Sequence, residues 1–82
     1  MKTFMKWVKQ YQYKYQMEYD DDYQLLETYF YNNNYKCKCK VRLYKNVKGG
    51  YVEDNNGNVT KCNSVKEVIE LVKFLTDGTI EL

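Results

Sequence analysis

The clearest periodic pattern in the chain lies near its C-terminal end. Ser64 precedes apolar residues spaced for one face of a helix: Val65, Val68, Ile69, Val72 and Leu75. Glu67 stands three residues after Ser64, which is the spacing of a capping box, in which each side chain binds a backbone N–H at the helix start. Gly78 follows, and glycine commonly ends a helix because it adopts the left-handed conformation. The pattern predicts a helix over 64–76, and the alternation in 79–82 predicts a short terminal strand.

Strict alternation marks residues 35–44. One set of alternate positions holds Tyr35, Cys37, Cys39, Val41 and Leu43, and the other holds Lys36, Lys38, Lys40 and Arg42. Such alternation is typical of a strand with one buried face. A hairpin is expected next, because residues 51–53 and 59–62 flank a turn that contains Asn56-Gly57.

The first third of the chain is ambiguous, because odd positions from Met5 to Tyr19 are mostly apolar or aromatic. A single strand over these residues would span roughly 50 Å, whereas a globule of this length has a radius of gyration of about 12 Å. We therefore expect a strand over 11–19. Residues 3–10 are left open between an extended segment and a short helix that carries Phe4, Trp7, Val8 and Tyr11.

Residues 21–31 also permit two interpretations. We favour a short helix with Leu25, Leu26, Tyr29 and Phe30 on one side. The alternative is a hairpin strand, because the residues 28–31 prefer extended structure. Together these patterns predict one α+β domain over 1–82. Its small antiparallel sheet has four to five strands and packs against a C-terminal helix, with a second short helix near 21–31.

Composition bears on the cellular location of the protein and on the kind of genome that encodes it. No apolar run reaches the roughly 20 residues that cross a bilayer, and the first residues lack the pattern of a signal peptide. We therefore expect a soluble cytoplasmic protein with reduced cysteines and no membrane partner. The chain is rich in lysine, asparagine and tyrosine, whose codons are AT-rich, and it lacks alanine and proline. This bias suggests a phage, a plasmid or a low-GC bacterium as its source.

The residues needed for catalysis are scarce. The chain has no histidine, and Ser64, its one serine, is already explained as a helix cap. Cys37, Cys39 and Cys62 are the nearest approach to a metal motif, but their spacing does not match a zinc knuckle and a fourth ligand is missing. We interpret these cysteines as small core residues and expect neither a metal, a cofactor nor an enzymatic activity. A small metal-binding protein or enzyme ranks as the third hypothesis.

Charge is strongly segregated although the net charge is only +2. The segment 18–31 carries five acidic residues and no basic ones, and 32–50 carries six basic residues and no acidic ones. Ten tyrosines exceed what a core of this size can bury, and tyrosine is enriched at interfaces. The candidate binding residues are therefore basic (Lys36, Lys38, Lys40, Arg42), aromatic (Tyr11, Tyr13, Tyr15) and acidic (Asp20, Asp21, Asp22). The ordinary alternatives are a solvated outer strand face and a solvated turn.

These features predict a non-enzymatic binding protein that acts through a basic, tyrosine-rich surface. The partner would be a host or phage protein, and an inhibitor of a defence system, of the anti-CRISPR type, is the specific hypothesis. The alternative is an accessory protein that binds single-stranded DNA or RNA, because lysines spaced along a strand match successive phosphates and tyrosines stack on bases. A homodimer is a further alternative.

Overall fold

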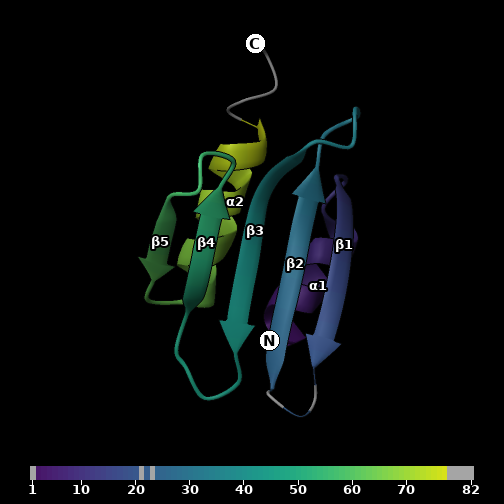
Figure 1. Cartoon of the computed structure of the whole chain (residues 1–82). Coiled ribbons are helices and arrows are strands. Elements are labelled where there is room, and N and C mark those ends of the chain that lie inside the picture. Colours follow the sequence, from purple (N-terminus) through teal and green to yellow (C-terminus); the bar gives the residue numbers. More distant parts are fainter. Residues whose placement is uncertain (1, 21, 23, 78–82) are drawn as a thin grey trace.

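The computed structural model describes residues 2–20, 22 and 24–77, and their fold is α+β, as predicted. The elements in chain order are α1 (Lys2–Gln10), β1 (Lys14–Asp20), β2 (Leu25–Tyr31), β3 (Cys37–Tyr44), β4 (Gly50–Asp54), β5 (Val59–Cys62) and α2 (Val65–Asp77). The five strands form one antiparallel sheet in the order β1-β2-β3-β4-β5, so each strand pairs with its neighbour in sequence (Figure 1).

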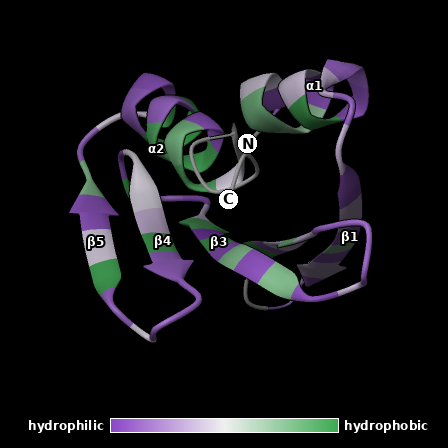
Figure 2. Ribbon diagram, turned by 90° about the horizontal axis from the view of Figure 1, so that it is seen from above, coloured by the Kyte–Doolittle hydropathy of each residue, from purple (hydrophilic) through white to green (hydrophobic). Residues whose placement is uncertain are grey.

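Both helices lie on the same face of the sheet (Figure 2). The core between the two layers contains residues with at most 1% of their surface exposed, drawn from both helices and the central strands: Phe4, Val8, Leu26, Phe30, Val41, Leu43, Val52, Val68 and Val72. The strand residues among them alternate with exposed or half-buried neighbours, because successive side chains of a strand point to opposite faces.

The helix predicted over 64–76 is confirmed as α2, and its start has the predicted cap. The Glu67 N–H donates to Ser64 Oγ at 3.2 Å, which places Ser64 at the N-cap. The Glu67 carboxylate accepts a hydrogen bond from the Asn63 N–H at 2.8 Å, one residue before the partner that a capping box provides. The predicted stop at Gly78 and the predicted strand over 79–82 lie outside the described residues.

The N-terminal segment begins with a helix, which was one of the two interpretations left open. The Tyr11 N–H donates to the Trp7 and Val8 carbonyls at 3.0 and 3.2 Å and so ends the helix. The strand starts at Lys14, three residues later than predicted, because the backbone turns at Tyr13, whose N–H donates to the Tyr11 carbonyl. Helix followed by strand keeps the radius of gyration at 12.0 Å.

The helix favoured for residues 21–31 is wrong, and the strand alternative is correct. β2 pairs with β1 along its whole length and with β3 on its other side. Leu26 and Phe30 are four residues apart, which places them on one face in a helix and in a strand alike. Thr28 decides between the two, since it is completely buried beside them, as only a strand allows.

The predicted hairpin over 51–53 and 59–62 is confirmed as β4 and β5. Its turn has Gly57 at a φ of 85°. Asp54 organises this turn, because one carboxylate oxygen accepts hydrogen bonds from the Asn56 and Asn58 N–H groups, each at 2.9 Å. Gly50 lies at the start of β4, where a β-carbon would stand 2.3 Å from Leu43 Cδ2, so a larger residue would displace part of the core.

Candidate functional site

The face of the sheet opposite the two helices is not covered by any helix or strand among the described residues (Figure 2). We call this surface the open face. The register of the central strands aligns its side chains in rows: Glu27, Tyr29 and Tyr31 of β2, Lys40, Arg42 and Tyr44 of β3, and Tyr51 and Glu53 of β4. These positions alternate with the buried ones, so polar and aromatic side chains of three neighbouring strands lie together on this face.

The predicted row of four basic residues is interrupted. Lys36 precedes β3 and is exposed in the turn before it. Lys38 lies at an irregularity in the pairing of β2 with β3, where Phe30 faces Cys39 and Tyr31 faces Cys37. Only Lys40 and Arg42 therefore belong to the regular open face. The expectation of an unbroken strand over 35–44 is wrong in this first part, where Tyr35 has a φ of 60° and is 74% exposed.

Lys40 and Arg42 are each paired with a carboxylate of the open face. Arg42 Nε donates to Glu27 Oε2 at 2.8 Å, and this hydrogen bond is the main reason why the pKa of Arg42 is raised. Lys40 Nζ lies 3.9 Å from Glu53 Oε1. The register explains both pairs, since Glu27 stands opposite Arg42 and Glu53 opposite Lys40. The centre of the open face is therefore close to charge balance rather than strongly basic.

Tyrosine rings lie beside these charges. Lys40 Nζ lies 5.4 Å from the centre of the Tyr29 ring, and Lys61 Nζ lies 5.6 Å from that of Tyr51. The rings of Tyr44 and Tyr51 meet edge to face with their centres 6.0 Å apart. These tyrosines were not among the predicted site residues, although Tyr44 and Tyr51 stand at outward positions of strands that the sequence indicates.

A hollow of about 440 Å³ opens between the tyrosines at the β4–β5 side of the open face. Its lining consists of Arg42, Tyr44, Val47, Tyr51 and Val59. Val47 and Val59 are 39% and 59% exposed, so apolar surface is accessible to a partner here. Tyrosine and arginine are enriched among the anchors of protein interfaces, and the exposed valines add apolar area between them.

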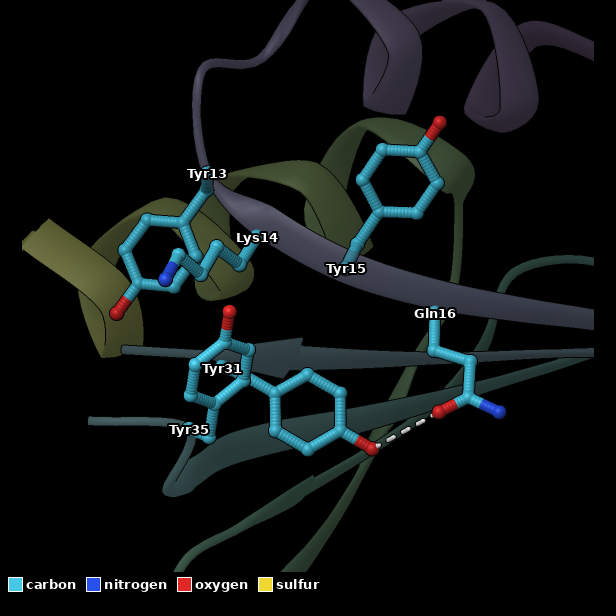
Figure 3. Close-up of a pocket in the computed structure, with 6 residues that line it drawn as sticks. All are labelled: Tyr13, Lys14, Tyr15, Gln16, Tyr31 and Tyr35. Carbon is cyan, nitrogen blue, oxygen red and sulfur yellow. Dashed lines mark hydrogen bonds between the residues drawn. The ribbon is translucent and has the colours of Figure 1, made fainter. Parts of the chain in front are cut away.

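The predicted aromatic residues lie elsewhere. Tyr11 and Tyr13 pack into the helix-covered side: the rings of Trp7 and Tyr11 stack with centres 4.5 Å apart, and Tyr13 follows at 5.9 Å from Tyr11. Tyr11 also shares a hydrogen bond with Thr76 of α2. Tyr15 projects from β1 on the side away from Gln16 and is 40% exposed (Figure 3). The structure thus does not bring Tyr11, Tyr13 and Tyr15 together with Lys40 and Arg42.

A second hollow, of about 470 Å³, lies where β1 and β2 meet the turn before β3 (Figure 3). Tyr13, Lys14, Tyr15, Gln16, Tyr31 and Tyr35 line it. Lys14 Nζ lies 4.1 Å from the centre of the Tyr35 ring, and Tyr31 donates a hydrogen bond to Gln16. The turn is held by Asn32, whose side-chain oxygen accepts from the Asn34 and Lys36 N–H groups.

Asp20 and Asp22 lie between β1 and β2, whereas Lys36 lies between β2 and β3, at the other end of β2. Asp20 ends β1, and its carboxylate accepts a hydrogen bond from the Asp22 N–H at 3.0 Å. Asp21 lies outside the described residues. Asp20 and Asp22 therefore form part of the β1–β2 turn and do not lie beside the basic residues of β3.

The three cysteines are free thiols. Cys39 and Cys62 are buried, and burial raises the pKa of Cys39 to about 12, so this thiol stays protonated near neutral pH. Burial also raises the pKa of Cys37 and of Cys62. Over the described part of the chain, no three cysteine, aspartate or glutamate side chains gather in the way that a metal ion requires.

Comparisons with known protein families, with curated proteins and with solved structures each find no match. No helix within the described ranges is long and apolar enough to span a bilayer.

Proposed function

We propose that this chain is a non-enzymatic binding protein that docks on another protein through its open face. The observation that carries the proposal is the hollow beside Tyr44 and Tyr51, whose accessible valines lie within a charge-balanced surface. A protein interface needs apolar anchors surrounded by polar groups with partners. The open face supplies both, and it lies opposite the helices that build the core.

The charge pairs favour a protein partner over nucleic acid. Phosphate binding depends on cations that exchange their counterions for the nucleic-acid backbone. Glu27 and Glu53 already neutralise Arg42 and Lys40 and would repel phosphates on either side of the row. A protein surface of mixed charge can instead add hydrogen bonds to these pairs.

The more specific proposal is that the partner is a host defence protein and that binding inhibits it, as anti-CRISPR proteins do. Its support is compositional: a small chain without histidine, and residues whose codons are typical of AT-rich phages and mobile elements.

A single exposed position tests the open face. Val59→Arg places a long charged side chain over the hollow from a residue that is 59% exposed, so the cost to folding is small. Phe74→Arg is the matched control, because Phe74 is 68% exposed on α2, on the other side of the molecule. The two substitutions introduce the same charge at similar exposure on opposite faces.

The experiment is affinity capture from a nuclease-treated lysate of a low-GC bacterium, followed by titration of the captured protein. Wild type and Phe74→Arg should retain the same protein, and Val59→Arg should bind it at least about tenfold more weakly, the equivalent of about 1.4 kcal/mol. Equal binding by all three would remove the open face from consideration. Inhibition is then measured as loss of the captured protein's own activity on addition of wild type but not of Val59→Arg.

Single-stranded nucleic acid is the second candidate, and the hollow around Tyr31 and Tyr35 favours it. Aromatic rings beside Lys14 match the stacking and phosphate contacts that single strands use. Binding of a labelled oligonucleotide should then weaken as salt rises, with a slope of about −0.7 per phosphate contact on a log–log plot. Tyr35→Ala should weaken it further, because Tyr35 is 74% exposed. Absence of binding at low salt would exclude this candidate.

A further inference from the structure

The outer edge of β1 is the longest regular edge of the sheet. β1 pairs with β2 through seven consecutive residue pairs without a bulge, and no described strand pairs with its other side. β5, at the opposite edge, has only four residues. Proteins usually protect such an edge with proline, bulges or a short strand. β1 has neither a proline nor a bulge and is longer than β5, so its outer N–H and C=O groups form a template for another strand, and its charged side chains restrict that strand to one of complementary charge.

The inner side of β1 is also incompletely covered. Leu26 and Phe30 on the neighbouring strand are completely buried, whereas Tyr15 and Tyr19, their partners on β1, are 40% and 50% exposed. The reason is the position of α1, since Phe4 and Trp7 pack against Phe30 of β2 and leave the outer row of β1 partly open. Two tyrosines and the half-buried Met17 therefore form an apolar strip along the edge.

The sequence of β1 is complementary to itself in the antiparallel direction. When two copies are paired about Met17, Lys14 of one stands opposite Asp20 of the other, and Gln16 stands opposite Glu18. Met17 meets Met17, and Tyr15 meets Tyr19, so the polar pairs share the open face and the apolar pairs share the helix side. This register uses all seven residues. A shift by one residue on each strand toward the C-terminal end would instead place Glu18 opposite Glu18.

From these observations we propose that two copies of this chain form a dimer by antiparallel pairing of β1 with β1. The product is a continuous ten-stranded sheet with the four helices on one side and a single, doubled open face on the other. Asp20 also accepts the Asp22 N–H, and the several lone pairs of a carboxylate let it accept more than one hydrogen bond. The inference does not depend on the proposed function, because Val59 and its hollow lie at the far side of the sheet from β1.

Charge reversal tests both the dimer and its register. Lys14→Asp places aspartate opposite Asp20 at two symmetric sites, and Asp20→Lys places lysine opposite Lys14. Each variant alone should dimerise roughly tenfold more weakly than wild type or worse, because like charges directly opposite repel. When the two variants are mixed, every pair is again opposite in charge, so a heterodimer should form with nearly wild-type affinity. Rescue by mixing has no explanation in a folding defect of either variant.

The measurement is sedimentation velocity over micromolar to millimolar concentration, with circular dichroism to verify that each variant folds. Val59→Arg serves as the control and should leave the dimer intact. A wild-type chain that stays monomeric over the whole range would overturn the proposal. So would a dimer that both single variants retain at full affinity, or two weakened variants that do not associate on mixing.

Discussion

Alternate residues of the same strands serve the two faces of this sheet in different ways. On β2, Leu26, Thr28 and Phe30 are completely buried under the helices, whereas Glu27 and Tyr29, one residue away, stand on the open face. The covered face holds the apolar core, and the open face holds charge pairs and tyrosine rings. A single strand thus contributes to the core through one set of residues and to the open face through the other.

The largest expected effect comes from removing a ring on the covered face. Phe30 contacts the rings of Phe4, Trp7, Tyr11 and Tyr13, and Phe30→Ala leaves a cavity among them. We expect a loss of about 3–5 kcal/mol in the free energy of unfolding. Tyr29→Ala, on the open face, should cost about 1 kcal/mol. Urea denaturation of both variants measures the two losses. Equal losses of unfolding free energy would mean that the open face stabilises the fold as much as the covered face does.

A smaller effect of opposite sign is expected at Thr28. Its hydroxyl is buried on the covered face and has no hydrogen-bond partner among the described residues. A buried polar group without a partner carries the cost of its lost hydration. Thr28→Val keeps the shape of the side chain and should therefore raise the free energy of unfolding by about 1 kcal/mol. Urea denaturation measures it, and a destabilised variant would indicate that the hydroxyl has a partner in solution.

The sequence predicts best those elements whose signals lie within a few residues of one another. The predictions of the C-terminal helix and of the β4–β5 hairpin are correct because their signals are local. Ser64 and Glu67 mark the start of the helix, and Gly57 marks the turn of the hairpin. The identity of β2 was missed because the spacing of Leu26 and Phe30 fits a helix as well as a strand. Pairing with β1 on one side and β3 on the other decides the outcome, and the residues of 21–31 taken alone do not show that pairing.

The candidate site was harder to predict than the fold. The alternation that places Lys40 and Arg42 outward is visible in the sequence, but their neutralisation by Glu53 and Glu27 depends on strand register. Tyr11 and Tyr13 are predicted as binding residues because ten tyrosines exceed what a core of this size can bury. They are instead in the segment that carries the chain from α1 to β1, where their rings fill the space beside Phe30.

On the open face, the Arg42–Glu27 pair should contribute little to stability. Both side chains are partly exposed, and such cross-strand pairs contribute roughly 0.2–1 kcal/mol. A double-mutant cycle with Arg42→Gln and Glu27→Gln should give a coupling in this range that decreases as salt is added. A coupling well above it, or one that salt leaves unchanged, would mean that the open face also supports the fold.

The smallest effect is expected from the carboxylate of Asp54, which ends β4 and organises the hairpin turn. The Asn58 N–H is the main cause of the lowered pKa of Asp54, and the Asn56 N–H adds to it. A lowered native pKa means that the charged form stabilises the fold. This contribution is complete above the unfolded pKa of about 3.9 and is lost as the pH falls through the native value.

Asp54→Asn keeps an acceptor oxygen but removes the titration. The difference in unfolding free energy between wild type and Asp54→Asn should therefore shrink as the pH is lowered from about 5 to about 2. If the difference instead stays constant across that range, the stability of the hairpin turn does not depend on the charge of Asp54.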